Sequence, residues 1–396
     1  MKTELHAVPA ACTQPHRAAL EQLRSHLRSL FVEREEVIDG LLLALLSKNH
    51  VLLVGPPGTG KSALVDALVD AIDGADSFSW LVSKFSTPEE ILGPISLQAL
   101  KQDRLRRMTQ GKLPTAHVAF LDEVSKASSA ILNTTLGITN ERRFSNDGQL
   151  VACPLMTLVG ASNELPTGDE LEAFFDRFVL RFELGYVRQA ESFRVLLTGT
   201  GMTGQATLSM AQLEQCQAEV DGVRVPDEIV EALLLLRQQL EERGFTASDR
   251  RWRQSLGVVK ARALLEGEDE GRLDHLEALS DMLWRRPQDR PELAQIVGTI
   301  ANPAAARATE ILDAAREAVA KLPALQGRDP DERAQWLGDA SRVESRLSAM
   351  EAEIQTLIQG ANGRTRRAKE ALLEVKSQRR ALTRRVAQVY GLGAGQ

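Results

Sequence analysis

The segment Gly55-Pro-Pro-Gly-Thr-Gly-Lys-Ser62 decides how the rest of the chain is interpreted. An apolar run, Val51-Leu-Leu-Val54, precedes it, and apolar residues at helical spacing follow it from Ala63 to Leu68. A strand, a glycine loop and a helix in this order predict a phosphate-binding loop. The glycines let backbone N–H groups converge on an anion, and the helix N-terminus adds a partial positive charge.

The side chains of this loop have distinct expected roles. Lys61 can reach the β- and γ-phosphates of a nucleotide, and the Ser62 hydroxyl can ligate Mg²⁺. The base needs an apolar surface, for which Val37 and Ile38 are candidates, although both can equally be ordinary core residues. The residues expected to contact the nucleotide are Val37, Ile38, Gly55, Pro56, Pro57, Gly58, Thr59, Gly60, Lys61, Ser62 and Ala63.

A second element of the expected site is the segment His117-Val-Ala-Phe-Leu-Asp-Glu123, an apolar strand that ends in two acids. Ligands of open α/β sheets bind at the carboxyl ends of the strands. Asp122 is therefore expected to hold Mg²⁺, directly or through water, and Glu123 to orient and deprotonate the attacking water. Two acids after an apolar run are common at strand ends, but their place after a glycine loop favours the functional interpretation.

Asn163 follows another apolar strand, Leu155–Ala161. Its side chain is a candidate to hydrogen-bond both the γ-phosphate and the lytic water. An asparagine at a strand end is more often a turn residue, so its place after the fourth predicted strand is what supports the role.

Arg177 directly precedes the fifth predicted strand, Phe178–Phe182. An arginine at the edge of such a domain can reach the γ-phosphate of a neighbouring subunit as an arginine finger. An ion pair with Asp176 or Glu172 of its own chain is an equal alternative.

Two further arginines, Arg250 and Arg251, stand at the start of a helix for which Ser248 is the expected N-cap. Positive charge there opposes the helix dipole. Because broken local rules tend to mark functional sites, one of the two is predicted to sense phosphate. The alternative is a surface arginine balanced by nearby acids.

Strands and helices alternate as far as residue 182, and helices predominate from residue 186 onward. This predicts an α/β fold with a parallel five-stranded sheet. The expected parts are a disordered N-terminus at 1–17, a nucleotide-binding domain at 18–198, an α-helical lid at 199–302 and a helical arm at 303–396. Apolar residues recur at heptad spacing on both sides of Gly360–Gly363, which predicts that the arm is an antiparallel helical hairpin.

Composition limits the class of partner. The net charge of −6 argues against a protein whose whole surface binds nucleic acid. Residues 364–385, however, carry nine Lys or Arg against two Glu. This basic last helix is either a solvated coiled-coil face or a contact for an acidic partner or nucleic acid. Three dispersed cysteines, with no signal-peptide pattern and no membrane span in the sequence, predict a cytoplasmic protein.

Three segments resemble the Walker A, Walker B and sensor-1 motifs of an AAA+ ATPase: GPPGTGKS at 55–62, FLDE at 120–123 and ASNELP at 161–166. Two further segments, 85–94 and 131–142, resemble the MoxR family. Within that family, Ser248-Asp-Arg-Arg-Trp252 and Leu283-Trp284 are similar to the RavA (regulatory ATPase variant A) branch. The resemblance extends over about residues 18–300.

The resemblance implies a hexameric ring that binds ATP or ADP with Mg²⁺ between subunits. It assigns Arg177 to the arginine finger, Arg250 to sensor 2 and residues 95–116 to the family's helix-2 insert, which faces the pore or a partner. It also implies a partner protein with a von Willebrand A domain. RavA-type chains carry a small β-rich domain within the arm, whereas here the bridge at 323–335 is too short for one.

The expected function is therefore an ATP-hydrolysing ring that remodels, activates or loads cofactor into a protein client. One alternative is a nucleotide-gated assembly switch that displays the basic arm. Another is a DNA-associated AAA+ protein that uses this arm.

Overall fold

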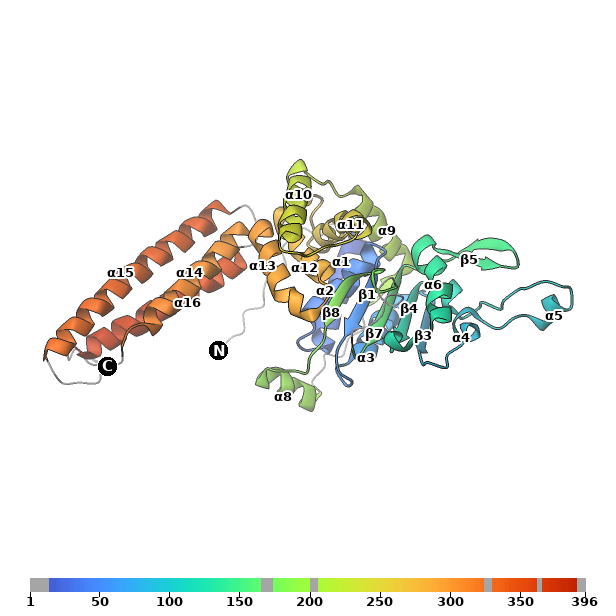
Figure 1. Ribbon diagram of the computed structural model, residues 1–396, viewed down its shortest axis with the longest axis horizontal. Coiled ribbons are helices and arrows are strands. Elements are labelled where there is room, and N and C mark those ends of the chain that lie inside the picture. Colours follow the sequence, from blue (N-terminus) through green and yellow to red (C-terminus); the bar gives the residue numbers. More distant parts are fainter. Residues whose placement is uncertain (1–13, 165–173, 200–205, 324–329, 362–364, 390–396) are drawn as a thin grey trace. The chain divides into compact units, whose positions relative to one another are not determined.

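The computed structural model describes residues 14–164, 174–199, 206–323, 330–361 and 365–389. Its residues form two compact units (Figure 1). One unit takes in the described residues as far as Pro226 together with Gly244–Gly271 and Ala278–Arg290. The other consists of Asp227–Arg243, Arg272–Glu277 and the described residues from Pro291 onward.

The first unit is built on a parallel sheet of five strands in the order β3-β4-β7-β1-β8. The strands are β1 (His50–Val54), β3 (Ser77–Leu81), β4 (Val118–Asp122), β7 (Thr157–Ser162) and β8 (Phe178–Glu183). All residues of β1 and β7 are buried, as expected of parallel strands covered on both faces. The predicted five-stranded parallel sheet is confirmed. At the edge of the sheet, Ser77 to Leu81 of β3 pair with Val118 to Asp122 of β4.

Helices pack on the strands that flank the glycine loop. α2 lies against β1 and β8, and α3 lies against β4 and β7. The helices are α1 (Pro15–Leu30), α2 (Glu35–Leu46), α3 (Lys61–Asp70), α4 (Pro88–Leu92), α5 (Leu97–Leu100), α6 (Ser129–Glu141), α8 (Ala190–Thr198), α9 (Met210–Gly222), α11 (Asp249–Leu265) and α12 (Ser280–Leu283). Residues 15–17, which were expected to be disordered, are the first turn of α1.

Two hairpins extend beyond the sheet and are joined to each other (Figure 1). The first turns at Asp147-Gly148 and is formed by β5 (Arg143–Asn146) and β6 (Gln149–Ala152). The second is the excursion that carries α5, closed by an antiparallel bridge between Ile95 and Arg107. The Arg107 N–H donates to Asn146 Oδ1 at 2.7 Å, and Asn146 Nδ2 donates to the Arg107 carbonyl at 3.2 Å.

The second unit contains α10 (Asp227–Glu242) and ends in an arm of long helices. α14 (Pro303–Ala320), α15 (Pro330–Gly360) and α16 (Arg366–Val389) all pack on one another (Figure 1). The helical arm is confirmed, and in its described residues α14 packs on the predicted hairpin of α15 and α16. The buried face of α14 consists largely of alanines such as Ala308 and Ala315.

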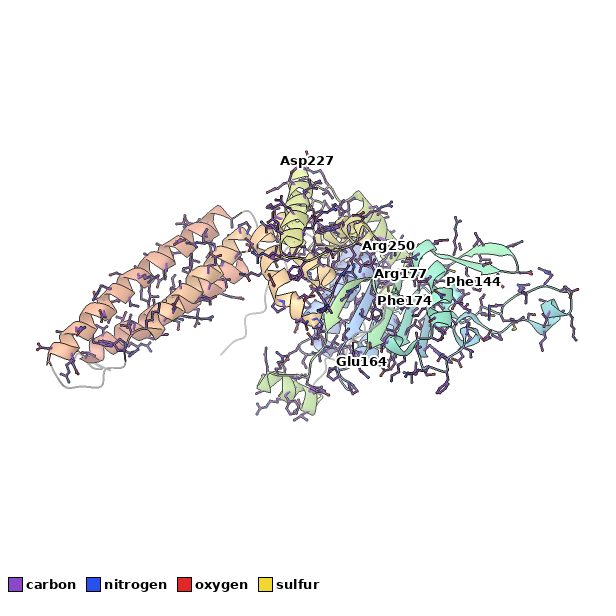
Figure 2. All side chains as sticks on the ribbon, in the orientation of Figure 1. Phe144, Glu164, Phe174, Arg177, Asp227 and Arg250 are labelled. Atoms are coloured by element: carbon purple, nitrogen blue, oxygen red, sulfur yellow. The ribbon has the colours of Figure 1, made fainter. Side chains whose placement is uncertain are left out.

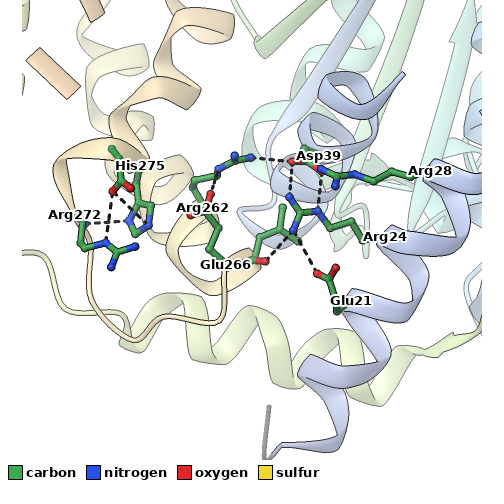
Figure 3. A network of polar contacts seen from close by, with 10 residues as sticks. Glu21, Arg24, Arg28, Asp39, Arg262, Glu266, Arg272 and His275 are labelled. Carbon is green, nitrogen blue, oxygen red and sulfur yellow. Dashed lines mark hydrogen bonds and ion pairs between the residues drawn. The ribbon is translucent and has the colours of Figure 1, made fainter. Parts of the chain in front are cut away.

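A buried carboxylate, Asp39, joins α2 to α1 and α11 (Figure 3). Arg24 donates to both of its oxygens at 2.8 and 2.6 Å, Arg28 donates at 2.7 Å and Arg262 at 3.0 Å. Burial by itself would raise the pKa of Asp39, but the hydrogen bonds and charges of the three arginines outweigh it and lower that pKa. Such a carboxylate stabilises the folded protein while it is ionised.

Replacing this carboxylate should be strongly destabilising. Asp39→Asn is expected to lower the free energy of unfolding at pH 7 by about 3 kcal/mol or more, because it leaves buried guanidinium groups uncompensated. The stabilisation by Asp39 is present above its unfolded pKa and is lost as the pH falls through its lowered folded pKa. Urea unfolding should therefore show a difference between variant and wild type that shrinks below about pH 4.

The matched control is Glu21→Gln, which removes the half-exposed carboxylate 3.3 Å from Arg24. This control should change stability by less than about 1 kcal/mol. Equal effects of the two substitutions would contradict the role given to Asp39.

Candidate functional site

The glycine loop leaves β1 and enters α3 in the conformation that the sequence predicts. Gly58 and Gly60 have φ of 78° and 82°, the left-handed region that favours glycine. At Gly55 a Cβ atom would lie 2.1 Å from the Leu184 carbonyl oxygen, so only glycine fits beside the end of β8. Ser62 and Ala63 are exposed in the first turn of α3.

Lys61 is turned toward the loop. Its Nζ donates to the carbonyl oxygens of Gly55 at 2.6 Å and Pro56 at 3.1 Å, and to Asn163 Oδ1 at 3.1 Å. Burial lowers the pKa of Lys61, and the charges of Asp122 and Glu123 partly offset this effect. The ammonium therefore lies within hydrogen-bond reach of the residue at the end of β7.

The two acids stand at the end of β4, next to Asn163. Glu123 has a left-handed backbone, with φ of 54° and ψ of 39°. Its Oε1 accepts a hydrogen bond of 2.5 Å from Asn163 Nδ2, and its backbone N–H donates to Asp122 Oδ1 at 2.9 Å. A continuous chain of hydrogen bonds thus runs from Lys61 through Asn163 to Glu123.

A cavity of about 550 Å³ opens beside the glycine loop. Its walls include Phe31 and Val32 from the connection between α1 and α2, Tyr186 from the segment after β8, and Phe193 of α8. Val37 and Ile38 do not line it: they are 6 % and 0 % exposed within α2. Both are core residues, as their alternative interpretation had it, and the apolar residues that line the cavity lie a few residues earlier in the chain.

Arg34 is a part of this site that no pattern in the sequence singled out. It is buried at the N-terminus of α2, and its Nη2 donates to the carbonyl oxygens of Gly185 at 2.7 Å and Thr59 at 3.3 Å. Burial lowers the pKa of its guanidinium. Tyr186 also donates to the loop, from its hydroxyl to the Pro57 carbonyl at 3.3 Å. Both contacts join the segment after β8 to the glycine loop.

Arg177 stands at the opposite end of the sheet. In the parallel pair of β1 and β8, Phe178 is opposite His50 and Glu183 is opposite Val54. Arg177 therefore precedes the strands whereas the glycine loop follows them, and at about 3.3 Å per residue roughly 17 Å of strand separates their backbones. Burial and the charge of Arg250 lower the pKa of Arg177, and the charge of Asp176 partly offsets this, so Arg177 lies within range of both charges.

In the view of Figure 2, Arg177 and Arg250 are labelled in the same region, and Glu164, which follows Asn163, is labelled toward the other end of the strands. The amide of Asn140, oriented with its oxygen toward Arg177, accepts from Nε at 3.1 Å and Nη2 at 3.2 Å. The alternative partner Asp176 forms its ion pair with Arg251, although its charge also acts on Arg177, and Glu172 lies outside the described residues.

Arg250 and Arg251 have different surroundings. Arg251 is 3 % exposed, pairs with Asp176 at 2.9 Å and donates to the carbonyl oxygens of Phe178 and Met282. Arg250 is exposed. Ser248 caps the helix as predicted and accepts from the Arg251 N–H. Arg251 therefore holds α11 to the start of β8, and Arg250 is the one of the pair that can meet an external anion.

Comparison with known proteins gives matches along most of the chain. Residues 18–222 match the MoxR domain of the MoxR-vWA-beta-propeller ternary systems, and residues 228–297 match an AAA lid domain. The uncharacterized protein MJ0079 of Methanocaldococcus jannaschii is 37 % identical over 285 residues, which are 72 % of this chain and 74 % of that protein. Chaperone MoxR1 of Mycobacterium tuberculosis is 26 % identical over 67 % of this chain and 75 % of its own length.

A crystal structure of a candidate ATPase from Cytophaga hutchinsonii has the same fold. Its TM-score is 0.58 at 18 % identity, over 72 % of this chain and 94 % of that one. The structural match is independent of close sequence similarity and agrees with the parallel sheet and the helical lid. The MoxR match takes in 205 of 396 residues (18 to 222), and the chain belongs to the MoxR family of AAA+ ATPases.

Proposed function

We propose that this protein hydrolyses ATP at the glycine loop, with residues from three neighbouring strands acting together. The observation that carries the proposal is the hydrogen-bonded chain Lys61–Asn163–Glu123, which the adjacent strands β1, β7 and β4 assemble. A lysine for the phosphates, a polar side chain for the lytic water and a carboxylate base are the parts that phosphoryl transfer to water requires.

The residues present fit a magnesium ion. The Ser62 hydroxyl is exposed at the start of α3, and the Asp122 carboxylate stands at the end of the neighbouring β4. Oxygen ligands from one hydroxyl and one carboxylate, completed by water and phosphate, are what Mg²⁺ prefers. When bound, the ion would neutralise charge on the phosphates. The cavity walls at Phe31, Val32 and Tyr186 would take the base and ribose.

Hydrolysis is proposed to need a second copy of the chain, in a ring of the hexameric kind. Arg177 and Arg250 adjoin each other at the end of the sheet away from their own glycine loop. A guanidinium reaches only a few ångströms from its backbone, far less than the roughly 17 Å of intervening strand. We assign both arginines to the γ-phosphate of a neighbouring subunit, Arg177 as the finger and Arg250 as the sensor.

The proposed role of this ring is to remodel, activate or load cofactor into a protein client. The matched family is described from systems that also contain von Willebrand A and β-propeller components, and a relative is named a chaperone. We accordingly propose a partner with a von Willebrand A domain. The RavA-like branch and a cytoplasmic location stay predictions. No helix of the described residues meets the length and hydropathy needed to cross a membrane.

The basic arm gives less support to a nucleic-acid function. Some basic side chains of α16 have partners within the arm itself. Arg379 pairs with Glu351 at 3.2 Å, and Arg385 lies over the Trp336 ring. A nucleotide-gated assembly switch remains the second candidate, because nucleotide bound between subunits would also control assembly. Stimulation of turnover by a client distinguishes remodelling from this switch.

Substituting the proposed base separates binding from turnover. Glu123→Gln is expected to bind ATP with unchanged affinity while kcat falls about 10²- to 10⁴-fold, because the amide cannot accept a proton from water. Phosphate release and binding of a fluorescent ATP analogue measure the two quantities. Normal turnover by this variant would remove Glu123 from the mechanism.

Mixing two inactive variants tests whether the site is shared. Lys61→Ala lacks a working loop and Arg177→Ala lacks the finger, so each alone should be inactive. Co-assembled in equal amounts, about a quarter of the interfaces would join an intact loop to an intact arginine, and ATPase activity should return accordingly. If the mixture stays as inactive as its components, Arg177 does not act across an interface.

Substitutions at the two consecutive arginines, Arg250 and Arg251, should affect different properties: the first ATPase activity and the second stability. Arg250→Met is expected to lose most ATPase activity with no change in melting temperature, because the side chain is exposed. Arg251→Met should lower the free energy of unfolding by about 3 kcal/mol, since it leaves Asp176 without its ion-pair partner and two carbonyl groups without their donor. A destabilised Arg250→Met with a stable Arg251→Met would reverse the assignment.

A further inference from the structure

The carboxylate of Glu123 has a second partner that the proposed function does not use. Its Oε1 accepts from Asn163, while its Oε2 lies 3.3 Å from Lys126 Nζ. The Glu123 side chain is 18 % exposed and that of Lys126 is 50 % exposed, so the pair lies at the mouth of the site. One oxygen thus faces a neutral amide and the other an ammonium.

Local structure holds Lys126 in this place. After β4 the chain makes a 3-10 turn, η2 (Val124–Lys126), closed by a hydrogen bond of 2.9 Å from the Lys126 N–H to the Glu123 carbonyl. Val124 is fully buried, and the Ser125 hydroxyl accepts from Ser162 of β7 at 2.9 Å. The left-handed backbone of Glu123 and the turn that follows bring the two side chains back toward each other.

The two partners of Glu123, Asn163 and Lys126, differ in which part of the structure fixes their positions. Asn163 also accepts from Lys61, so its position depends on the glycine loop and on whatever the loop binds. Lys126 belongs to the same turn as Glu123 and moves with it. Lys126 is therefore the constant partner and Asn163 the exchangeable one.

We propose that Lys126 is a positioning residue for the water-activating step: it holds Oε2 of Glu123 so that Oε1 faces the lytic water. The inference rests on the proposed ATPase function. In the step, a water proton passes to Oε1 while the water oxygen forms a bond to the γ-phosphorus. The bond from that phosphorus to the bridging oxygen breaks, and ADP leaves with the bonding electron pair.

The proposal distinguishes Lys126 from an ordinary surface lysine. A half-exposed ion pair contributes little to stability, so removing it should leave the fold unchanged. Its loss would instead allow the Glu123 side chain to sample other rotamers. Misplacing a catalytic group by about 1 Å can reduce the rate by up to about 10²-fold. The effect should therefore appear in kcat, with KM for ATP unchanged.

The experiment compares Lys126→Met, Lys126→Arg and wild type in the full-length assembly, by steady-state ATPase kinetics, binding of a fluorescent ATP analogue and melting temperature. Lys126→Met is expected to lower kcat about tenfold, with KM, binding and melting unchanged. Lys126→Arg should keep kcat within about twofold of wild type, since the longer cation can still reach Oε2. The matched control is Lys321→Met, which removes an exposed lysine 2.6 Å from Glu317 on α14 and should leave all quantities unchanged.

An unchanged kcat in Lys126→Met would overturn the inference, and so would a loss accompanied by an equal rise in KM or by a lower melting temperature. These outcomes are distinct from failure of the proposed function. If wild type itself released no phosphate, or if Glu123→Gln turned over normally, the ATPase assignment would fail. An active wild type with an inactive Glu123→Gln and a fully active Lys126→Met would remove Lys126 alone.

Discussion

Parallel pairing of β4, β7 and β1 is the constraint on which the proposed site depends. Adjacent strands lie about 4.8 Å apart, and parallel strands bring their carboxyl ends to one edge of the sheet. Lys61, Glu123 and Asn163 come from distant parts of the chain, yet each follows one of these strands. Because β7 lies between the other two, Asn163 can bond to both neighbours at once.

The same strand polarity places the two arginines of the proposed mechanism, Arg177 and Arg250, at the end of the sheet away from the glycine loop. β8 pairs in parallel with β1, so the residue before β8 and the loop after β1 are at opposite ends of one sheet. Asp176 and Arg251 fasten that far end to α11, which leaves Arg177 and Arg250 together at its surface. A subunit built this way carries half of two proposed sites, one at each end, and association of copies would complete both.

Local signals in the sequence determined much of the fold. The glycine loop, the two acids at the end of β4 and the Asp147-Gly148 hairpin each depend on residues that are close together in the sequence. Backbone conformations and helix caps, such as that of Ser248, are set over such short distances, and the period of apolar residues marks each strand. The five-stranded sheet and the placing of Lys61, Glu123 and Asn163 at one edge were therefore predictable.

Tertiary structure alone decided which side chains are free to act. Val37 and Ile38 look as suitable for a base as Phe31, but only packing against the sheet buries the first two and leaves Phe31 in the cavity wall. Arg250 and Arg251 are adjacent in the sequence and chemically identical. Their surroundings differ because Asp176, which is distant in the sequence, pairs with Arg251. The alanine face of α14 is identified as a buried packing surface only in the folded arm, where two other helices cover it. Burial and partners are set by residues far apart in the chain, so no local pattern records them.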